Sequence, residues 1–156
     1  PEEAVSSLVK QADVAICSEV VEHVDDPLAL CYRIRDYLKP GGRLYLTAPG
    51  GPMSSFDRHI GHRKHYTRDT ISQLLTKAGF TVETTLRAGF PCFNLYRLLV
   101  IMMGKRLIAS ISSENNPGGA GFLAGMAMRI FRVAFACNKL DSPFGWQMVA
   151  IAYCRS

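Results

Sequence analysis

The sequence predicts an α/β domain in which the strands of a mainly parallel sheet alternate with helices. Residues 12–18 form a short apolar run typical of a buried parallel strand, and residues 80–86 alternate between apolar and polar side chains. Apolar residues recur at helical spacing over 28–38 and again over 71–78. With a further apolar strand at 43–48, the first ninety residues predict the order strand, helix, strand, helix, strand.

Both predicted helices carry capping signals at their ends. Asp26 precedes Pro27, which is typical of an N-cap followed by proline at the first helical position. The run Lys-Pro-Gly-Gly at 39–42 is expected to end this helix and to lead into the next strand. The second helix is expected to begin after Thr67 and to end before Gly79, where a left-handed C-cap belongs.

The composition is that of an ordinary globular domain. The chain has 156 residues, of which 48% are hydrophobic and 20% charged, and this length fits one domain with a single core. The net charge of +5 is compatible with an anionic ligand, a nucleic acid or an anionic membrane surface, but the basic residues are scattered. Five cysteines without C-x-x-C spacing indicate reduced thiols and a cytoplasmic protein. The longest apolar run, 98–103, is far shorter than the ~20 residues of a membrane span.

Residues 92–140 differ from the rest and predict a helical insert. A strongly apolar helix is expected over 93–108, followed by a polar, glycine-rich linker and a second helix over 122–133. The apolar side chains fit a core, a lid over a hydrophobic substrate, or a face that contacts a membrane or a second copy of the chain. A last strand is expected over 146–153.

Four segments in register resemble the C-terminal half of class I S-adenosylmethionine-dependent methyltransferases. Residues 13–27 (DVAICSEVVEHVDDP) resemble the fourth strand of that family and the loop after it, and 38–49 (LKPGGRLYLTAP) its turn into the fifth strand. Residues 61–68 (GHRKHYTR) resemble the segment leading to the sixth strand, and 143–146 (PFGW) the start of the antiparallel last strand. The resemblance implies a Rossmann-like sheet and an S-adenosylmethionine-dependent methyltransferase.

The family's glycine-rich cofactor loop and the acidic residue after it have no counterpart in this sequence. Residues 1–156 are therefore expected to form a partial methyltransferase domain with an incomplete sheet. Two explanations are open. The chain is a piece of a longer protein, or it is a half-domain that pairs with another copy or a partner through the exposed edge of its first strand.

The carboxyl end of the first strand is the expected cofactor side. In open α/β sheets, ligands bind beyond the carboxyl ends of the strands. Cys17, Ser18, Glu19 and Val20 occupy that position, and the resemblance implies that they contact the methionine end of S-adenosylmethionine. The simpler alternative is that Ser18 only ends the strand.

Glu19, Glu22 and His23 form the most informative set of candidate site residues in the sequence. Two carboxylates and an imidazole within five residues suit a hard cation such as magnesium or manganese. The Glu-x-x-Glu-His string is similar to the metal-binding motif of small-RNA 2′-O-methyltransferases and ubiquinone-biosynthesis O-methyltransferases. In the RNA enzymes a later histidine completes the site, and His62 stands at the matching place. The alternatives are a metal-free general base at His23, or a structural role for these residues.

The long loop at 49–66 adds Asp57, His59 and His65 to the candidate groups. Such a cluster can close over an active site, act as a base or bind phosphate, or it can be a solvated loop. His23 and His62 are the expected catalytic residues.

Methyl transfer to oxygen of a small molecule, lipid precursor or glycan is the expected function. The sulfonium carbon of the donor is already activated, so the protein must align it and supply a deprotonated nucleophile. A metal-dependent RNA 2′-O-methyltransferase is the first alternative, although no aromatic platform interleaved with basic residues favours nucleic acid. A non-catalytic pairing module is the second. A homo-oligomer or a membrane surface are the further partners that the apolar insert allows.

Overall fold

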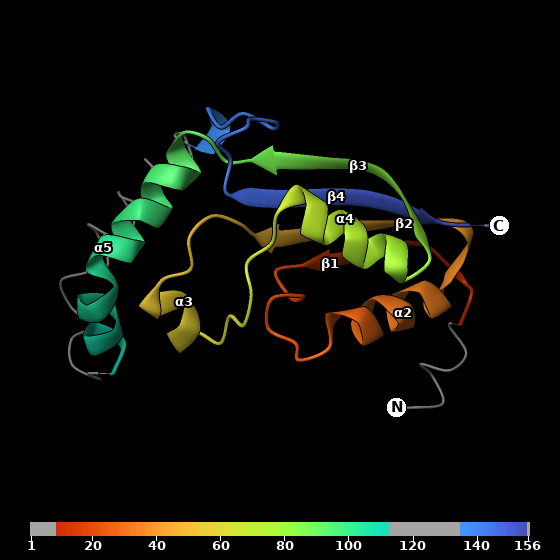
Figure 1. Cartoon of the computed structure of the whole chain (residues 1–156), viewed down its shortest axis with the longest axis horizontal. Helices are drawn as coiled ribbons and strands as arrows, with labels where there is room; N and C mark the ends of the chain where they lie inside the picture. Colours follow the sequence, from red (N-terminus) through yellow and green to blue (C-terminus); the bar gives the residue numbers. More distant parts are fainter. Residues whose placement is uncertain (1–8, 113–134, 156) are drawn as a thin grey trace.

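Four strands form one open sheet in the computed structural model, which describes residues 9–112 and 135–155 (Figure 1). The strands lie in the order β1-β2-β4-β3. Strand β1 runs parallel to β2, whereas β4 is antiparallel to both of its neighbours. This mixed sheet with an antiparallel last strand confirms the predicted α/β class. The strands are β1 (Ala12–Ser18), β2 (Leu38–Pro49), β3 (Phe80–Ala88) and β4 (Gln147–Cys154).

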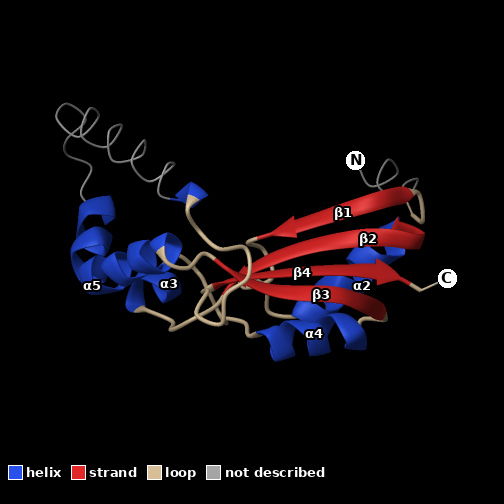
Figure 2. Ribbon diagram, turned by 90° about the horizontal axis from the view of Figure 1, so that it is seen from above, coloured by secondary structure: helices blue, strands red, loops and turns tan. Residues whose placement is uncertain are grey.

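The helices take two positions relative to this sheet. Helices α2 (Pro27–Tyr37) and α4 (Arg68–Lys77) cover one face of it. Helices α3 (Ser55–His59) and α5 (Cys92–Ser112) lie together beyond the carboxyl ends of β1 and β2, as Figure 2 shows from above. Helices α3 and α5 therefore stand at the end of the sheet where ligands bind in this class of fold.

The predicted helix caps are present. The Asp26 side chain accepts hydrogen bonds from the backbone N–H groups of Leu28 and Ala29, at 3.0 and 2.9 Å. At the start of α4, the Thr67 hydroxyl accepts from the backbone N–H of Thr70. Helix α2 ends at Tyr37, as the run at 39–42 predicted, but the strand was expected to begin only at residue 43. Strand β2 already begins at Leu38 and pairs with β1 through an irregularity, because the Pro-Gly-Gly segment is absorbed as a bulge.

The hydrophobic core lies between the sheet and helices α2 and α4. Alternate residues of β2 and β4, such as Leu44, Leu46 and Ala150, are fully buried and meet Ile71 and Leu75 of α4. Burying a side chain of this size contributes about 1.5–3 kcal/mol to folding. The period of two along each central strand therefore fixes which face receives the helices.

The other face of the sheet and the outer edge of β1 are open within the described residues. Ile16 of β1 is 76% exposed, and Val14 is exposed as well. Strand β1 has β2 as its neighbour on one side and no strand on the other among the described residues. The predicted exposed edge is thus confirmed for this part of the chain, whereas pairing through it stays a prediction.

The predicted insert is described only in part. Helix α5 begins at Cys92, one residue before the predicted helix, and continues to Ser112. The second predicted helix, 122–133, and most of the linker before it lie outside the described residues. None of the helices in the described ranges is both long and apolar enough to cross a membrane.

Gly79 adopts the left-handed conformation predicted for a C-cap, with φ of 86°. Replacing Gly79 with alanine should cost about 1–2 kcal/mol for the backbone alone. A Cβ there would also displace the Arg35 guanidinium, which donates to the Ala78 carbonyl, so we expect about 1 kcal/mol more. Gly41 is the matched control, because its φ is 77° and a Cβ would meet nothing within 4 Å. Equal losses for the two variants in urea denaturation would show that the Arg35 contact contributes nothing.

Candidate active site

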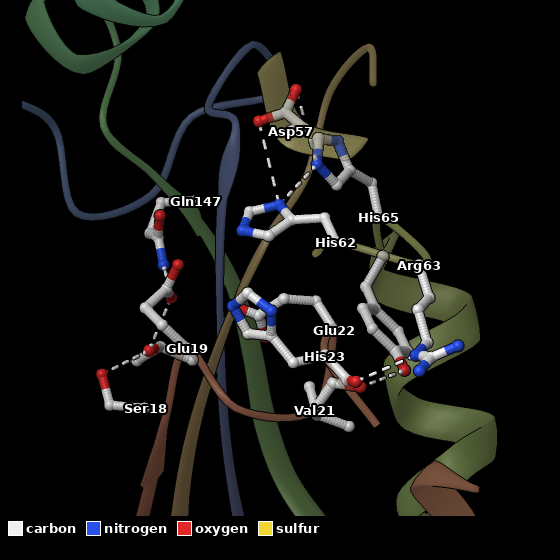
Figure 3. A network of polar contacts seen from close by, with 12 residues as sticks. Ser18, Glu19, Val21, Glu22, His23, Asp57, His62, Arg63, His65 and Gln147 are labelled. Atoms are coloured by element: carbon white, nitrogen blue, oxygen red, sulfur yellow. Dashed lines mark hydrogen bonds and ion pairs between the residues drawn. The ribbon is translucent and has the colours of Figure 1, made fainter. Parts of the chain in front are cut away.

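The ends of β1 and β2 meet the beginning of β4 at one point. Ser18 pairs with Thr47, and their hydroxyl oxygens are 2.8 Å apart. The Glu19 carboxylate accepts hydrogen bonds from the Thr47 hydroxyl, at 2.9 Å, and from the Gln147 amide, at 2.6 Å (Figure 3). The predicted tips of two neighbouring parallel strands are therefore side by side, as a ligand site at this edge of the sheet requires.

Glu19 turns the chain out of the strand. Its φ is 53°, a left-handed conformation that costs about 1–3 kcal/mol for a residue other than glycine and concentrates at functional sites. Hydrogen bonds from Thr47 of β2 and Gln147 of β4 hold its carboxylate. After this turn, Val21 and Glu22 enter the interior.

The Glu22 side chain is fully buried, and neither carboxylate oxygen has a hydrogen-bond partner among the described residues. Burial raises the pKa of Glu22, and the charge of Glu19 raises it further, against a lowering effect of His23. A buried carboxylate without a donor is costly. A ligand that brings positive charge could offset this cost.

Two imidazoles stand next to this carboxylate. The rings of His23 and His62 meet edge to face with their centroids 4.7 Å apart, and His23 Nε2 is 3.8 Å from Glu22 Oε1. One ligand atom from each of Glu22, His23 and His62 lies within 4.8 Å of the other two. The His23 side chain is 39% exposed, whereas that of His62 is 9% exposed. The cluster is therefore open on the His23 side.

The structure brings three of the four predicted metal ligands together. The fourth, Glu19, directs its carboxylate to Thr47 and Gln147 instead. Among the residues predicted to contact the cofactor, Ser18, Glu19 and Val20 are exposed at the strand end. Cys17 is buried in the core, where burial raises the pKa of its thiol.

The loop after α3 clamps the turn that carries the cluster. Arg63 donates from its backbone N–H to the Glu22 carbonyl, at 2.8 Å, and from Nε to the His23 carbonyl, at 3.0 Å. The Tyr66 hydroxyl donates to the Val21 carbonyl at 3.2 Å. These contacts place His62 over the turn. Residues 61–66 are thus held against the site, although they have no regular secondary structure.

A buried ion pair supports His62 from behind. Arg97 of α5 donates to both Asp57 oxygens, at 2.6 and 3.0 Å, and Ser54 donates to the same carboxylate. Burial alone would raise the pKa of Asp57, but the hydrogen bonds from Arg97 and Ser54 outweigh it and hold that pKa well below its usual range. Asp57, His62 and His65 also offer three clustered ligand atoms. Arg97 already occupies both Asp57 oxygens, which disfavours a cation there.

Sequence reasoning missed Arg97. Its only signal is that Arg97 is the one charged residue in the apolar first part of α5, from Cys92 to Met103. His59, in contrast, is exposed at the end of α3, where the sequence predicted a solvated loop.

A family model described as "Methyltransferase domain" matches residues 2–85. This match contains β1, β2 and the Glu22–His23–His62 cluster. The chain belongs to this family.

Relatives of this methyltransferase domain agree with the fold. A ubiquinone biosynthesis O-methyltransferase from Dinoroseobacter shibae is 34% identical over 92 residues, covering 49% of this chain and 37% of that protein. Phosphoethanolamine N-methyltransferase 2 from Haemonchus contortus, solved with S-adenosylhomocysteine, is 19% identical with a TM-score of 0.51, covering 95% of this chain and 34% of its own. The cyclase SpnF is 17% identical with a TM-score of 0.56, covering 94% of this chain and 51% of its own.

The chain spans between about a third and a half of the length of these relatives. A cyclase and an N-methyltransferase share the fold, so the fold alone does not define the reaction. The chemistry must be argued from the side chains at the strand ends.

Proposed function

We propose that the protein transfers a methyl group from S-adenosylmethionine to an oxygen atom of a small molecule, and that Glu22, His23 and His62 hold a magnesium or manganese ion at the acceptor site. The observation that carries this proposal is the buried Glu22 carboxylate, which has no donor among the described residues and has two imidazoles beside it. Membership of the methyltransferase family supports the methyl donor. The named relative that is an O-methyltransferase supports an oxygen acceptor.

Each side chain of the cluster has a separate task in this proposal. Glu22 supplies the negative charge that fixes the cation, and its burial keeps water from competing for it. His62 supplies a ring nitrogen from the closed side of the cluster, and His23 supplies one from the open side. A divalent cation at this point would lower the pKa of a substrate hydroxyl and favour its attack on the methyl carbon.

The strand end beside the cluster suits the methionine part of S-adenosylmethionine. Ser18, Glu19 and Val20 are exposed there, and the Glu19 carboxylate is fixed in place by Thr47 and Gln147. A fixed carboxylate can accept from the α-ammonium group of the cofactor. The rest of the cofactor site requires polypeptide that covers the open face beside β1, because the sequence has no glycine-rich turn after its first strand.

A metal-free mechanism is the second candidate, and the exposed imidazole of His23 favours it. Its side chain is within 3.8 Å of the Glu22 carboxylate and open to solvent, as a general base must be. In that case the Glu22 carboxylate would stabilise the imidazolium that forms when His23 takes the proton.

Exchanging His62 for alanine should abolish manganese binding in the full-length protein. Loss of a residue that only hydrogen-bonds a metal ligand typically weakens metal binding about 10–100-fold, and we expect a larger loss here because His62 is a ligand itself in this proposal. Electron paramagnetic resonance of Mn²⁺ measures the affinity. His59→Ala is the matched control, because this exposed histidine lies three residues before His62, at the end of α3, and its loss should leave the affinity unchanged.

Two further measurements separate the candidate functions. Calorimetry with S-adenosylmethionine on the full-length protein should show binding, and failure to bind would leave only the pairing-module alternative. Methylation of a catechol that survives EDTA without loss of rate would remove the metal and support the His23 base. Methylation of RNA 3′ ends in place of small hydroxyl compounds would overturn the small-molecule acceptor.

A further inference from the structure

His65 connects the cluster to the backbone of the loop after β2. Its Nδ1 is 3.1 Å from the Gly51 carbonyl oxygen. A carbonyl oxygen can only accept, so Nδ1 of His65 carries the hydrogen. In a neutral imidazole the other nitrogen, Nε2, then has a lone pair and can only accept.

His62 is the neighbour that meets this lone pair. Its Nδ1 is 3.3 Å from His65 Nε2, and Figure 3 shows the two rings next to each other beside Asp57. His62 Nδ1 must therefore donate. The Asp57 carboxylate lies 3.8 Å from the same nitrogen and favours a hydrogen there as well.

The surroundings of the two rings leave their mutual contact undisturbed. The His65 side chain is only 7% exposed, and Asp57, the nearby carboxylate, already has both oxygens engaged by Arg97. For two neutral imidazoles, the distances from His65 to Gly51 and to His62 therefore allow only one order of donors.

We propose that His65 is a positioning residue that holds His62 in its Nδ1–H tautomer and so leaves the Nε2 lone pair available to the site. This inference rests on the proposed function, because both a metal ligand and a general base at His62 need an unprotonated Nε2. His62 Nε2 has no hydrogen-bond partner among the described residues, whereas Nδ1 is engaged. The chain of contacts runs from the Gly51 carbonyl through His65 to His62.

Two substitutions of His65 each remove one of its two contacts and keep the other. The amide nitrogen of asparagine lies where Nδ1 was, so His65→Asn keeps the bond to Gly51 but offers His62 no acceptor. The amide oxygen of glutamine reaches the place of Nε2, so His65→Gln keeps an acceptor for His62 and loses the Gly51 bond. The pair is matched in polarity and burial.

The tautomer of His62 is measured directly by long-range ¹H–¹⁵N correlation spectra of the full-length protein at neutral pH. We expect the Nδ1–H form in the wild type and in His65→Gln, and its loss in His65→Asn. A wild-type spectrum with hydrogen on Nε2, or an unchanged tautomer in His65→Asn, would overturn the inference. The wild-type measurement decides the first point even if a variant fails to fold.

Manganese titration of the same samples keeps the two proposals apart. His65→Asn should bind Mn²⁺ about 10–100-fold more weakly than the wild type, and His65→Gln close to the wild-type value. If the wild type shows the Nδ1–H tautomer but binds no Mn²⁺, the positioning inference stands and the metal proposal fails. If Mn²⁺ binds equally to both variants, His65 does not position His62 and the inference fails alone.

Discussion

Replacing Glu22 with glutamine should stabilise the folded protein at neutral pH and remove its binding of divalent cations. The pKa of Glu22 is raised in the folded state, chiefly by burial, so ionisation of this carboxyl opposes folding. Stability is therefore lost as the pH rises from the unfolded-state pKa, about 4.3, toward the folded-state pKa. Glutamine has the same shape and no charge, so the variant avoids a loss of about 1.4 kcal/mol for each pKa unit of the shift.

Urea denaturation between pH 4 and 8 measures this difference. The gain of Glu22→Gln over the wild type should be absent near pH 4, grow as Glu22 ionises and then level off. Glu19→Gln is the matched control, because that carboxylate is exposed and already accepts two hydrogen bonds. We expect no gain from it.

Added Mn²⁺ tests the reason for the instability. Saturation at 100 times the dissociation constant should stabilise the wild type by about 2.7 kcal/mol and leave Glu22→Gln unchanged. A variant that is less stable than the wild type at every pH, or that gains as much from Mn²⁺, would contradict the role given to Glu22. A substitution that raises stability and removes function is typical of residues that serve a binding or catalytic site at the expense of the stability of the fold.

The order of strands and helices follows from local signals in the sequence. Apolar runs and helical spacing are properties of neighbouring residues, and the Asp26 and Thr67 caps act within one turn of their helices. The position of Ser18 at the ligand edge follows in the same way, because parallel strands of an open sheet present their carboxyl ends together. These features could be predicted without the structure.

The directions of the site's side chains depend on partners far along the chain. Glu19 leaves the predicted metal set because Gln147, 128 residues away, binds its carboxylate. Arg97 reaches Asp57 across 40 residues, and a loop without regular structure brings His62 to His23. A motif fixes residue types and spacing but not which oxygen meets which donor, so the Glu-x-x-Glu-His string could not show that the Glu19 carboxylate turns to Thr47 and Gln147. The cluster of Glu22, His23 and His62 was predictable; its support by Asp57, Arg97 and His65 was not.

Replacing Arg97 with methionine should destabilise the protein by about 3–5 kcal/mol, because it leaves the Asp57 charge buried without a partner. In the wild type, the pKa of Asp57 is depressed in the folded state, so this group adds stability above its unfolded-state pKa of about 3.9. That stability is lost as the pH falls through the folded-state pKa. In Arg97→Met the lowering contributions of Arg97 are lost, so the pKa of Asp57 rises from its wild-type value and the stability difference from the wild type should narrow as acid protonates Asp57.

The double variant Asp57→Asn with Arg97→Met distinguishes the ion pair from simple packing. A neutral amide no longer needs the guanidinium, so the double variant should recover much of the stability lost in Arg97→Met, with a coupling energy of about 0.5–3 kcal/mol. Arg97→Lys is the conservative control, since an ammonium cannot bond both Asp57 oxygens in the same fork. Urea denaturation gives the free energies, and amide exchange in α3 and α5 shows whether the loss is local to that contact. If the two single losses simply add, the pair contributes only packing, and the support for His62 must come from His65 alone.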